Sequence, residues 1–338
     1  ISILLVLAAH LLPLGPKALR VNEAAALAGM AIFFTLSGFL ITTFLLERPS
    51  LRDFLARRFF RIVPLVWLVM LVSLSLWGAS AEQWRAHFLF YANLPPFWLL
   101  DVTSPLWSVC VEMQFYLGIA LLYAVFGVRG LWLTPVLAIV VTLMRVDHGR
   151  FDSIVTWWRV DEILVGCCLA LAVHARPAAL HDDALRRKAS LARWLLVPLF
   201  AASCHPGLPI EFSYLRPYAA AALVGTTLVA PVGVLSSRAL AYIATISFAL
   251  YVIHPLLVHS WLGSGDTIER YLKRPLLVAA LWGLAHLSTF HYERHWIRLG
   301  HRFGGRVDRR RVDGEPVVSG TSPAPQPRTT ALRDSQRP

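Results

Sequence analysis

The sequence predicts an all-α protein: a polytopic bundle of about ten membrane-spanning helices. Hydrophobic residues make up 57% of the 338 positions and charged residues only 15%, whereas about a quarter of the residues of a soluble domain are charged. Long apolar segments recur along the chain. The basic residues lie in short loops between these segments, as expected of residues that orient a membrane protein.

Ten apolar segments are expected to cross the bilayer, since a span needs about 20 mostly apolar residues. They are residues 1–14, 24–46, 62–79, 108–126, 130–144, 160–174, 191–204, 217–235, 240–262 and 275–291. The segment 86–100 is apolar too, but its Asn93-Leu94-Pro95-Pro96 run would break a helix. We therefore interpret it as an interfacial or re-entrant piece.

The distribution of Arg and Lys predicts the orientation. With both termini in the cytoplasm, the two densest basic loops, around Arg57 and around Arg187, fall on the cytoplasmic side together with the basic tail. Residues 1–303 then form the membrane domain, and 304–338, rich in Gly, Pro, Ser and Arg, form a disordered cytoplasmic tail. The net charge of +12 is spread through these loops, which argues against a nucleic-acid partner. We expect a multi-pass protein of the bacterial inner membrane.

Neither a metal site nor a cofactor is expected. The four cysteines lie in or beside apolar segments without metal-ligand spacing, and we assign them no function. The chain begins at Ile1, inside an apolar run and without Met or the basic n-region of a signal peptide. We therefore expect that a few N-terminal residues are missing.

An ionisable residue inside a span is costly, so each one is a functional hypothesis. His10 lies in the first span, and imidazole can take a proton from a hydroxyl near neutral pH. This suggests a general base. The structural alternative is a histidine near the helix end that is bonded to a backbone carbonyl or to interfacial water.

Arg58 and Arg61 come at the opening of the third span. A spacing of three places both guanidinium groups on one helix face, where they can grip phosphate oxygens bidentately. Arginines at cytoplasmic helix ends are also ordinary topological anchors. Both interpretations stay open on the residues alone.

Ser108, Glu112 and Tyr116 are four residues apart and form a polar stripe on an apolar helix. A carboxylate inside a span must face a partner or water. Glu112 can therefore pair with an arginine, orient His10 or position an acceptor hydroxyl. The alternative is an ion pair that only holds helices together.

Further polar residues have a structural interpretation beside a functional one. They are Ser37 and Gly38, Arg159 with Asp161 and Glu162, and His254. A Ser-Gly step allows two helices to approach closely. The two carboxylates precede an apolar run and suit a helix N-terminus. His254 precedes Pro255 and can hydrogen-bond the carbonyl that a proline leaves free.

Taken together, these segments resemble the membrane acyltransferase family 3, which includes O-antigen and peptidoglycan O-acetylases and macrolide O-acyltransferases. In the family's order, the motifs are ILLVLAAH, GMAIFFTLSGFLITTFLLE, SLRDFLARRFFRIVPL, SPLWSVCVEMQFYL, WRVDEILVGCCLA, ISFALYVIHPLLV and HYERHWIRL. Each motif alone is weak, but the combination is specific and covers nearly the whole chain.

The resemblance implies roles for particular residues. The family's first-span histidine, its catalytic base, matches His10. Its Arg-x-x-Arg pair, associated with the acyl donor, matches Arg58 and Arg61, and its Ser-x-x-x-Glu motif matches Ser108 and Glu112.

Two features depart from the family pattern. The family's arginine eleven residues before the histidine would fall ahead of Ile1. The acidic residue that usually follows the glycine of the second span is replaced, since the sequence reads Gly29-Met30-Ala31.

The resemblance implies transfer of an acyl group, in the simplest case acetyl, from acyl-coenzyme A. The acceptor is a hydroxyl of a cell-surface polysaccharide, lipopolysaccharide, peptidoglycan or macrolide-type polyketide. The chief alternative is a transporter or an exporter of a lipid-linked saccharide, in which the same Glu and His are relay or substrate groups. The inverted repeats common in transporters are not recognisable in the sequence. A third alternative is an inactive membrane scaffold.

Overall fold

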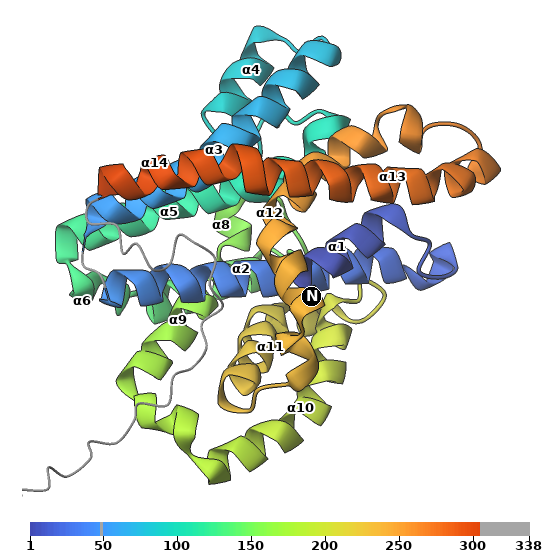
Figure 1. The fold of residues 1–338 in the computed structure, drawn as a ribbon. Coiled ribbons are helices and arrows are strands. Elements are labelled where there is room, and N and C mark those ends of the chain that lie inside the picture. The colour runs from blue at the N-terminus through green and yellow to red at the C-terminus, as the bar shows by residue number, and fades with distance from the viewer. Residues whose placement is uncertain (48–49, 305–338) are drawn as a thin grey trace, which may run out of the picture. The chain divides into compact units, whose positions relative to one another are not determined.

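The described part of the protein is built from helices throughout (Figure 1). The structure is a computed structural model that describes residues 1–47 and 50–304. Its longer helices are α1 (Ser2–Leu11), α2 (Val21–Glu47), α3 (Leu51–Leu76), α4 (Ala81–Phe88), α5 (Trp107–Phe126), α7 (Thr134–Asp147), α9 (Asp161–Ala175), α10 (Asp183–Cys204), α11 (Ile210–Val229), α12 (Arg238–Val258), α13 (Thr267–Leu287) and α14 (Arg294–Gly304). Two short helices, α6 (Val128–Leu131) and α8 (Thr156–Arg159), lie between them. The all-α prediction is confirmed for the described residues, and the predicted tail lies outside them from residue 305 onward.

Five helical segments of the described chain are long and apolar enough to cross a membrane. They are Lys17–Glu47, Leu51–Leu76, Asp101–Phe126, Val128–Asp147 and Arg238–Val258. The predicted count of about ten spans is therefore not confirmed. The other helices fall short because α1 and α9 have only 10 and 15 residues. In addition, α10 and α13 begin with the charged sequences DALRRK and TIERYLKR.

The outer surface of the bundle is apolar where a membrane protein contacts lipid. On α5, Leu117, Leu121 and Val125 are 65%, 67% and 62% exposed and follow one another at helical spacing. Such a continuous exposed stripe of large apolar side chains would be a liability in water. Together with the five long apolar helices, this stripe identifies the chain as a membrane protein.

α3 begins earlier than the sequence predicted. The Ser50 hydroxyl accepts a hydrogen bond from the backbone N–H of Asp53, so the helix is capped there and begins at Leu51. Arg58 and Arg61 consequently lie well inside α3 rather than at its opening. The apolar-window prediction began at residue 62 because the first turns of α3 are rich in arginine.

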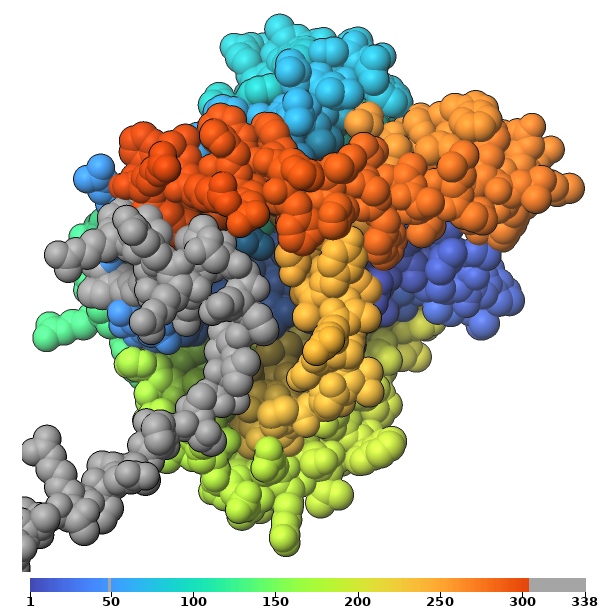
Figure 2. Space-filling view, in the orientation of Figure 1, coloured from blue at the N-terminus to red at the C-terminus, as the bar shows by residue number. Residues whose placement is uncertain are grey.

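α14 packs along the part of α3 that carries the arginines. Phe60 of α3 stacks on Trp296 and Phe303, and Gly300 lies against the same ring. Figure 2 shows α13 and α14 (orange to red) covering one side of the molecule, with α12 (amber) reaching the surface beside them. The basic helix α14 therefore lies along the arginine-rich first turns of α3, where Arg57 Nη1 is 2.8 Å from His301 Nδ1.

The segment 86–100 is part helix and part irregular chain. A capping box of Ser80 and Gln83 begins α4, which ends at Phe88. The predicted break at Asn93–Pro96 is confirmed, and a 3-10 helix, Asp101–Leu106, then leads into α5. His87 joins these pieces, because its Nδ1 bonds the Gln83 carbonyl at 2.7 Å and its Nε2 bonds the Thr103 hydroxyl at 2.8 Å. Burial lowers the pKa of His87.

Two glycines bring α2 and α9 into backbone contact. A Cβ atom on Gly38 would lie 1.9 Å from the carbonyl oxygen of Ile163, and one on Gly166 would lie 2.1 Å from that of Thr35. Both distances are far inside van der Waals contact. The interpretation of the Ser37-Gly38 step as a close helix approach is thus confirmed for Gly38.

Gly38→Ala is expected to force α2 and α9 apart and to lower the apparent Tm in detergent, at a cost of about 1–3 kcal/mol. The matched control is Gly118→Ala on α5, because a Cβ atom there meets nothing within 4 Å. That change should keep or raise the Tm, since Ala is the better helix former by up to about 1 kcal/mol. A Gly38→Ala protein that unfolds at the wild-type temperature would contradict the predicted clash.

Candidate active site

His10 lies in the last turn of α1, which is held against α2 by polar contacts at both ends. The Ser2 hydroxyl donates to the Gly29 carbonyl at 2.8 Å, and the Asn22 amide donates to the Ala9 carbonyl at 2.7 Å. His10 is exposed. Its ring lies near that of His254 on α12, with the two ring centroids 5.2 Å apart.

His254 is buried, only 1% exposed, beneath His10. Its Nδ1 bonds the carbonyl oxygen of Tyr251 at 2.6 Å. Pro255 has no N–H to donate to the carbonyl four residues before it, which is that of Tyr251. The predicted bond between His254 and a carbonyl released by the proline is therefore confirmed. The Nε2 atom of His254 has no hydrogen-bond partner within the described chain.

Tyr251 continues the polar contacts from His254 toward α5. Its ring centroid is 5.6 Å from that of His254. Its hydroxyl donates to the carbonyl of Pro105 and lies 2.6 Å from the Ser108 hydroxyl, which must then be the donor to Tyr251. Tyr251 was not among the predicted site residues, although it comes one turn before His254 in the ISFALYVIHPLLV motif.

Glu112 lies one turn further along α5 and is 5% exposed. The Ser37 hydroxyl donates to its Oε1 at 2.6 Å, and the Tyr116 hydroxyl donates to the same oxygen. The described residues place no arginine in an ion pair with Glu112 and show no contact between Glu112 and His10. The predicted pairing with an arginine and the orienting of His10 therefore find no support. Positioning of an acceptor hydroxyl stays a prediction.

Arg58 completes this series at the other end. Its guanidinium carbon lies 5.7 Å from the ring centroid of Tyr116, in a cation–π contact, and the side chain is half-buried. Arg61, one turn later on α3, is exposed. Only Arg58 of the predicted pair therefore touches the polar interior.

We call this connected series the polar column. Its members are His10, His254, Tyr251, Ser108, Glu112, Tyr116 and Arg58. The length of the column can be measured along α2, because Asn22 of α2 lies beside the end of α1 that carries His10 and Ser37 of α2 lies beside Glu112. At 1.5 Å per residue these two positions are ~22 Å apart along the helix. This length is comparable with much of the ~30 Å hydrocarbon core of a bilayer.

A second polar group, which we call the arginine cluster, lies beside the column. It consists of Arg145, Arg159 and Arg216 with Asp152, Asp161 and Glu162. Asp161 accepts from Arg145 at 2.5 Å, Glu162 accepts from Arg216 at 2.8 Å, and all four side chains are at most 1% exposed. Both carboxylates lie in the first turn of α9 as predicted, and Asp161 Oδ1 accepts the backbone N–H of Glu162 at 3.0 Å, but this is not their whole role. They neutralise arginines that other helices bring into the interior.

Arg159 connects the arginine cluster to the column. Its guanidinium group pairs with Asp152 and lies over the rings of Phe34 and Trp107, at 6.0 Å and 5.3 Å from their centroids. Trp107 directly precedes Ser108 of the column. Arg159, predicted as a supporting residue, thus lies one aromatic layer away from the polar column, while Asp161, also predicted as supporting, pairs with Arg145 within the arginine cluster.

The comparisons with known proteins decide what class of site this is. The family described as an acyltransferase domain, acyltransferase 3, matches residues 1–289, which include every member of the polar column. The chain belongs to this acyltransferase family. The family membership favours an enzyme over a transporter or an inactive scaffold.

One relative of this acyltransferase has a curated name. The chain is 30% identical over 184 residues to a protein of Bacillus subtilis (strain 168) named "Putative peptidoglycan O-acetyltransferase YrhL". The match covers 42% of this chain and 28% of that protein, so the chain spans less than a third of the relative's length. No solved structure matches the chain.

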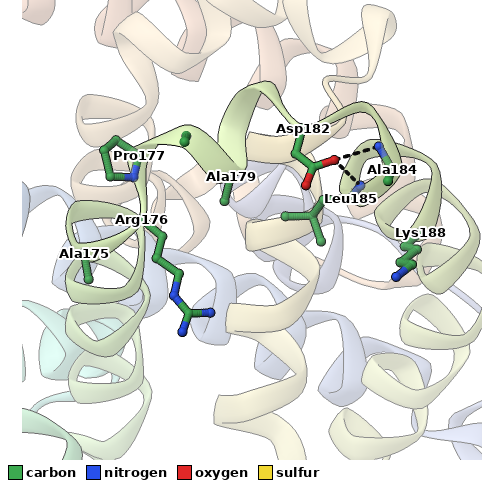
Figure 3. Close-up of a pocket in the computed structure, with 9 residues that line it drawn as sticks. Ala175, Arg176, Pro177, Ala179, Asp182, Ala184, Leu185 and Lys188 are labelled. Atoms are coloured by element: carbon green, nitrogen blue, oxygen red, sulfur yellow. Dashed lines mark hydrogen bonds between the residues drawn. The ribbon is translucent and has the colours of Figure 1, made fainter.

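A surface hollow of the acyltransferase lies away from these residues. It is formed where α9 turns into α10 (Figure 3), and the predicted site residues are not among those that line it. Asp182 in this hollow accepts hydrogen bonds from the backbone N–H groups of Ala184 and Leu185, so it caps α10. Arg176 and Lys188 lie on either side of this cap. The hollow is therefore not part of the polar column.

Proposed function

We propose that this acyltransferase moves an acyl group, in the simplest case acetyl, from acyl-coenzyme A to a hydroxyl of a carbohydrate or of a macrolide-type molecule. The observation that carries the proposal is the polar column, which joins an imidazole at one end to an arginine at the other. We place the protein in the bacterial inner membrane with the arginine end at the cytoplasm, where acyl-coenzyme A is available.

The protein does not have to activate the acyl group, because a thioester is already an activated acyl donor. His10 takes the proton of the acceptor hydroxyl as the oxygen bonds to the thioester carbonyl carbon. The carbon–sulfur bond then breaks, and the proton passes from His10 to the departing sulfur, which leaves as free coenzyme A. The remaining work is to hold both substrates in line and to stabilise the oxyanion.

Residues at different positions along the column have different proposed tasks. Arg58 and Arg61 bind phosphate groups of the donor, and Glu112, held by Ser37 and Tyr116, positions the acceptor. Because the arginine end and His10 are separated by the depth of the column, the pantetheine arm of the donor runs along it. Arg159, Asp161 and His254 support the helices that carry these groups.

A carbohydrate acceptor draws support from the relative named for peptidoglycan O-acetylation. Peptidoglycan, lipopolysaccharide and cell-surface polysaccharide all offer sugar hydroxyls to the same base. A macrolide-type acceptor offers a hydroxyl of the same reactivity and differs mainly in its apolar body.

The proposal is tested with the full chain in proteoliposomes that are supplied with radiolabelled acetyl-coenzyme A and, from outside, with one acceptor at a time. We expect release of free coenzyme A thiol together with label on the acceptor. Accumulation of an unmodified acceptor inside the vesicles, with no thiol released, would favour the transporter instead.

The donor assignment is tested by the double variant Arg58→Ala, Arg61→Ala. Each charge-assisted hydrogen bond to a phosphate is worth about 1.5–3 kcal/mol. The Kd for coenzyme A should therefore rise by roughly tenfold or more. The measurement is calorimetric titration with coenzyme A, and the matched control is Arg52→Ala, an exposed arginine of the same helix. An unchanged Kd in the double variant would reduce the pair to a topological anchor.

A further inference from the structure

We infer that His254 positions His10 for the reaction, by accepting a hydrogen bond from the His10 ring through Nε2. His254 then fixes which nitrogen of His10 is free to take the acceptor proton. This inference rests on the proposed role of His10 as the base. It goes beyond that role because it assigns a task to the second imidazole.

The first step is the protonation state of His254. Its Nδ1 bonds the Tyr251 carbonyl at 2.6 Å, and a carbonyl oxygen can only accept. Nδ1 therefore carries the proton. In a neutral imidazole the other nitrogen, Nε2, then has a lone pair and no hydrogen.

The second step is the surroundings of that lone pair. Nε2 is buried and unpartnered in the described structure, and a buried acceptor left without a donor costs about 1–3 kcal/mol. The titratable side chains near the His254 ring are His10 on α1, Tyr251 on α12 and His259 at the C-terminal cap of α12. Tyr251 already donates its hydroxyl proton to Pro105, and Nδ1 of His259 bonds the Pro255 carbonyl at 2.9 Å. His10 is the neighbour with an N–H to spare.

The third step is the consequence for His10. If a His10 nitrogen without a proton faced Nε2, two lone pairs would meet across the contact. Donation to Nε2 removes this repulsion and leaves the lone pair of His10 on the nitrogen away from His254. A hydroxyl that arrives there meets an acceptor and not a donor. When His10 takes that proton it still donates to Nε2, so His254 steadies the imidazolium without being protonated itself.

A purely structural role for His254 would not need Nε2. The bond to the Tyr251 carbonyl is made by Nδ1 alone, and the side-chain amide of asparagine can place an N–H donor near the same point. Glutamine, by contrast, can place an acceptor oxygen near the position of Nε2. The two substitutions therefore separate the structural bond from the proposed positioning bond.

The test compares His254→Asn and His254→Gln in the full chain, with His259→Asn, at the C-terminal cap of the same helix, as the matched control. We expect His254→Asn to lower kcat for acyl transfer by roughly 10- to 100-fold, part of the 10²–10⁴-fold that a general base supplies. The KM for acyl-coenzyme A should not change. His254→Gln should recover a good part of the rate, and His259→Asn should stay near wild type.

A second measurement does not depend on activity. The ¹⁵N signals of the labelled His10 ring report which nitrogen is protonated, and that preference should be clear in the wild type and lost in His254→Asn. If wild type transfers no acyl group, the proposed function fails while the ¹⁵N comparison still tests the hydrogen bond. If His10→Ala abolishes transfer but His254→Asn keeps the wild-type kcat and His10 signals, the inference is overturned.

Discussion

Replacing His10 with alanine should lower kcat for acyl transfer by about 10²–10⁴-fold, because a general base supplies that much of the rate. His10 is exposed, and the described residues offer it no hydrogen-bond partner apart from the bond inferred to His254, so folding should be affected little. The measurement is release of coenzyme A thiol by purified protein at saturating donor and acceptor.

The control is His259→Ala, which removes another exposed histidine from the same end of the bundle. It should keep near wild-type kcat. Full activity in a well-expressed His10→Ala protein would exclude His10 as the base, and the proton acceptor would then have to be sought deeper in the polar column.

The second large effect is expected in the arginine cluster, from Asp161→Ala. The substitution leaves Arg145 buried without its carboxylate, and breaking a buried pair in this way costs about 3–5 kcal/mol. The loss should appear as a marked fall in the apparent Tm in detergent and in the yield of folded protein. Asp161→Asn should be milder, since the amide oxygen can still accept a hydrogen bond from the guanidinium group.

The matched control for this prediction is Glu23→Ala, which breaks the Arg20–Glu23 pair on the surface. Exposed pairs gain little because water and salt screen them, so the Tm should hardly move. A similar small change for Asp161→Ala would mean that Arg145 is satisfied by its backbone contacts to Phe151 and Ser213 alone.

The sequence predicted well what depends on local spacing. Ser108, Glu112 and Tyr116 fall on one face of α5 because the helical repeat places residues four apart together. The bond from His254 to a released carbonyl follows from Pro255 in the same way. The helix break at Asn93–Pro96 is also a local property of the chain.

What depends on distant contacts could not be predicted. Ser37 lies 75 positions before its partner Glu112, and no spacing rule relates two residues on different helices. Arg145 and Arg216 were interpreted as loop charges that set topology, since nothing local shows that they meet Asp161 and Glu162 in the interior. The count of about ten spans is not confirmed, and apolar windows do not show where charged first turns begin a helix, as they do in α10 and α13.

The glycine contact between α2 and α9 ties the two polar groups of the interior together mechanically. Ser37, which holds Glu112, directly precedes Gly38, and Gly38 rests on the backbone of Ile163, two positions after Asp161. With no side chain between them, neither helix can slide or rotate alone. A displacement of α9 near Asp161 should therefore also displace Ser37 on α2, and with it the Glu112 carboxylate that Ser37 holds. The position of Glu112 then depends on the buried ion pairs of the arginine cluster.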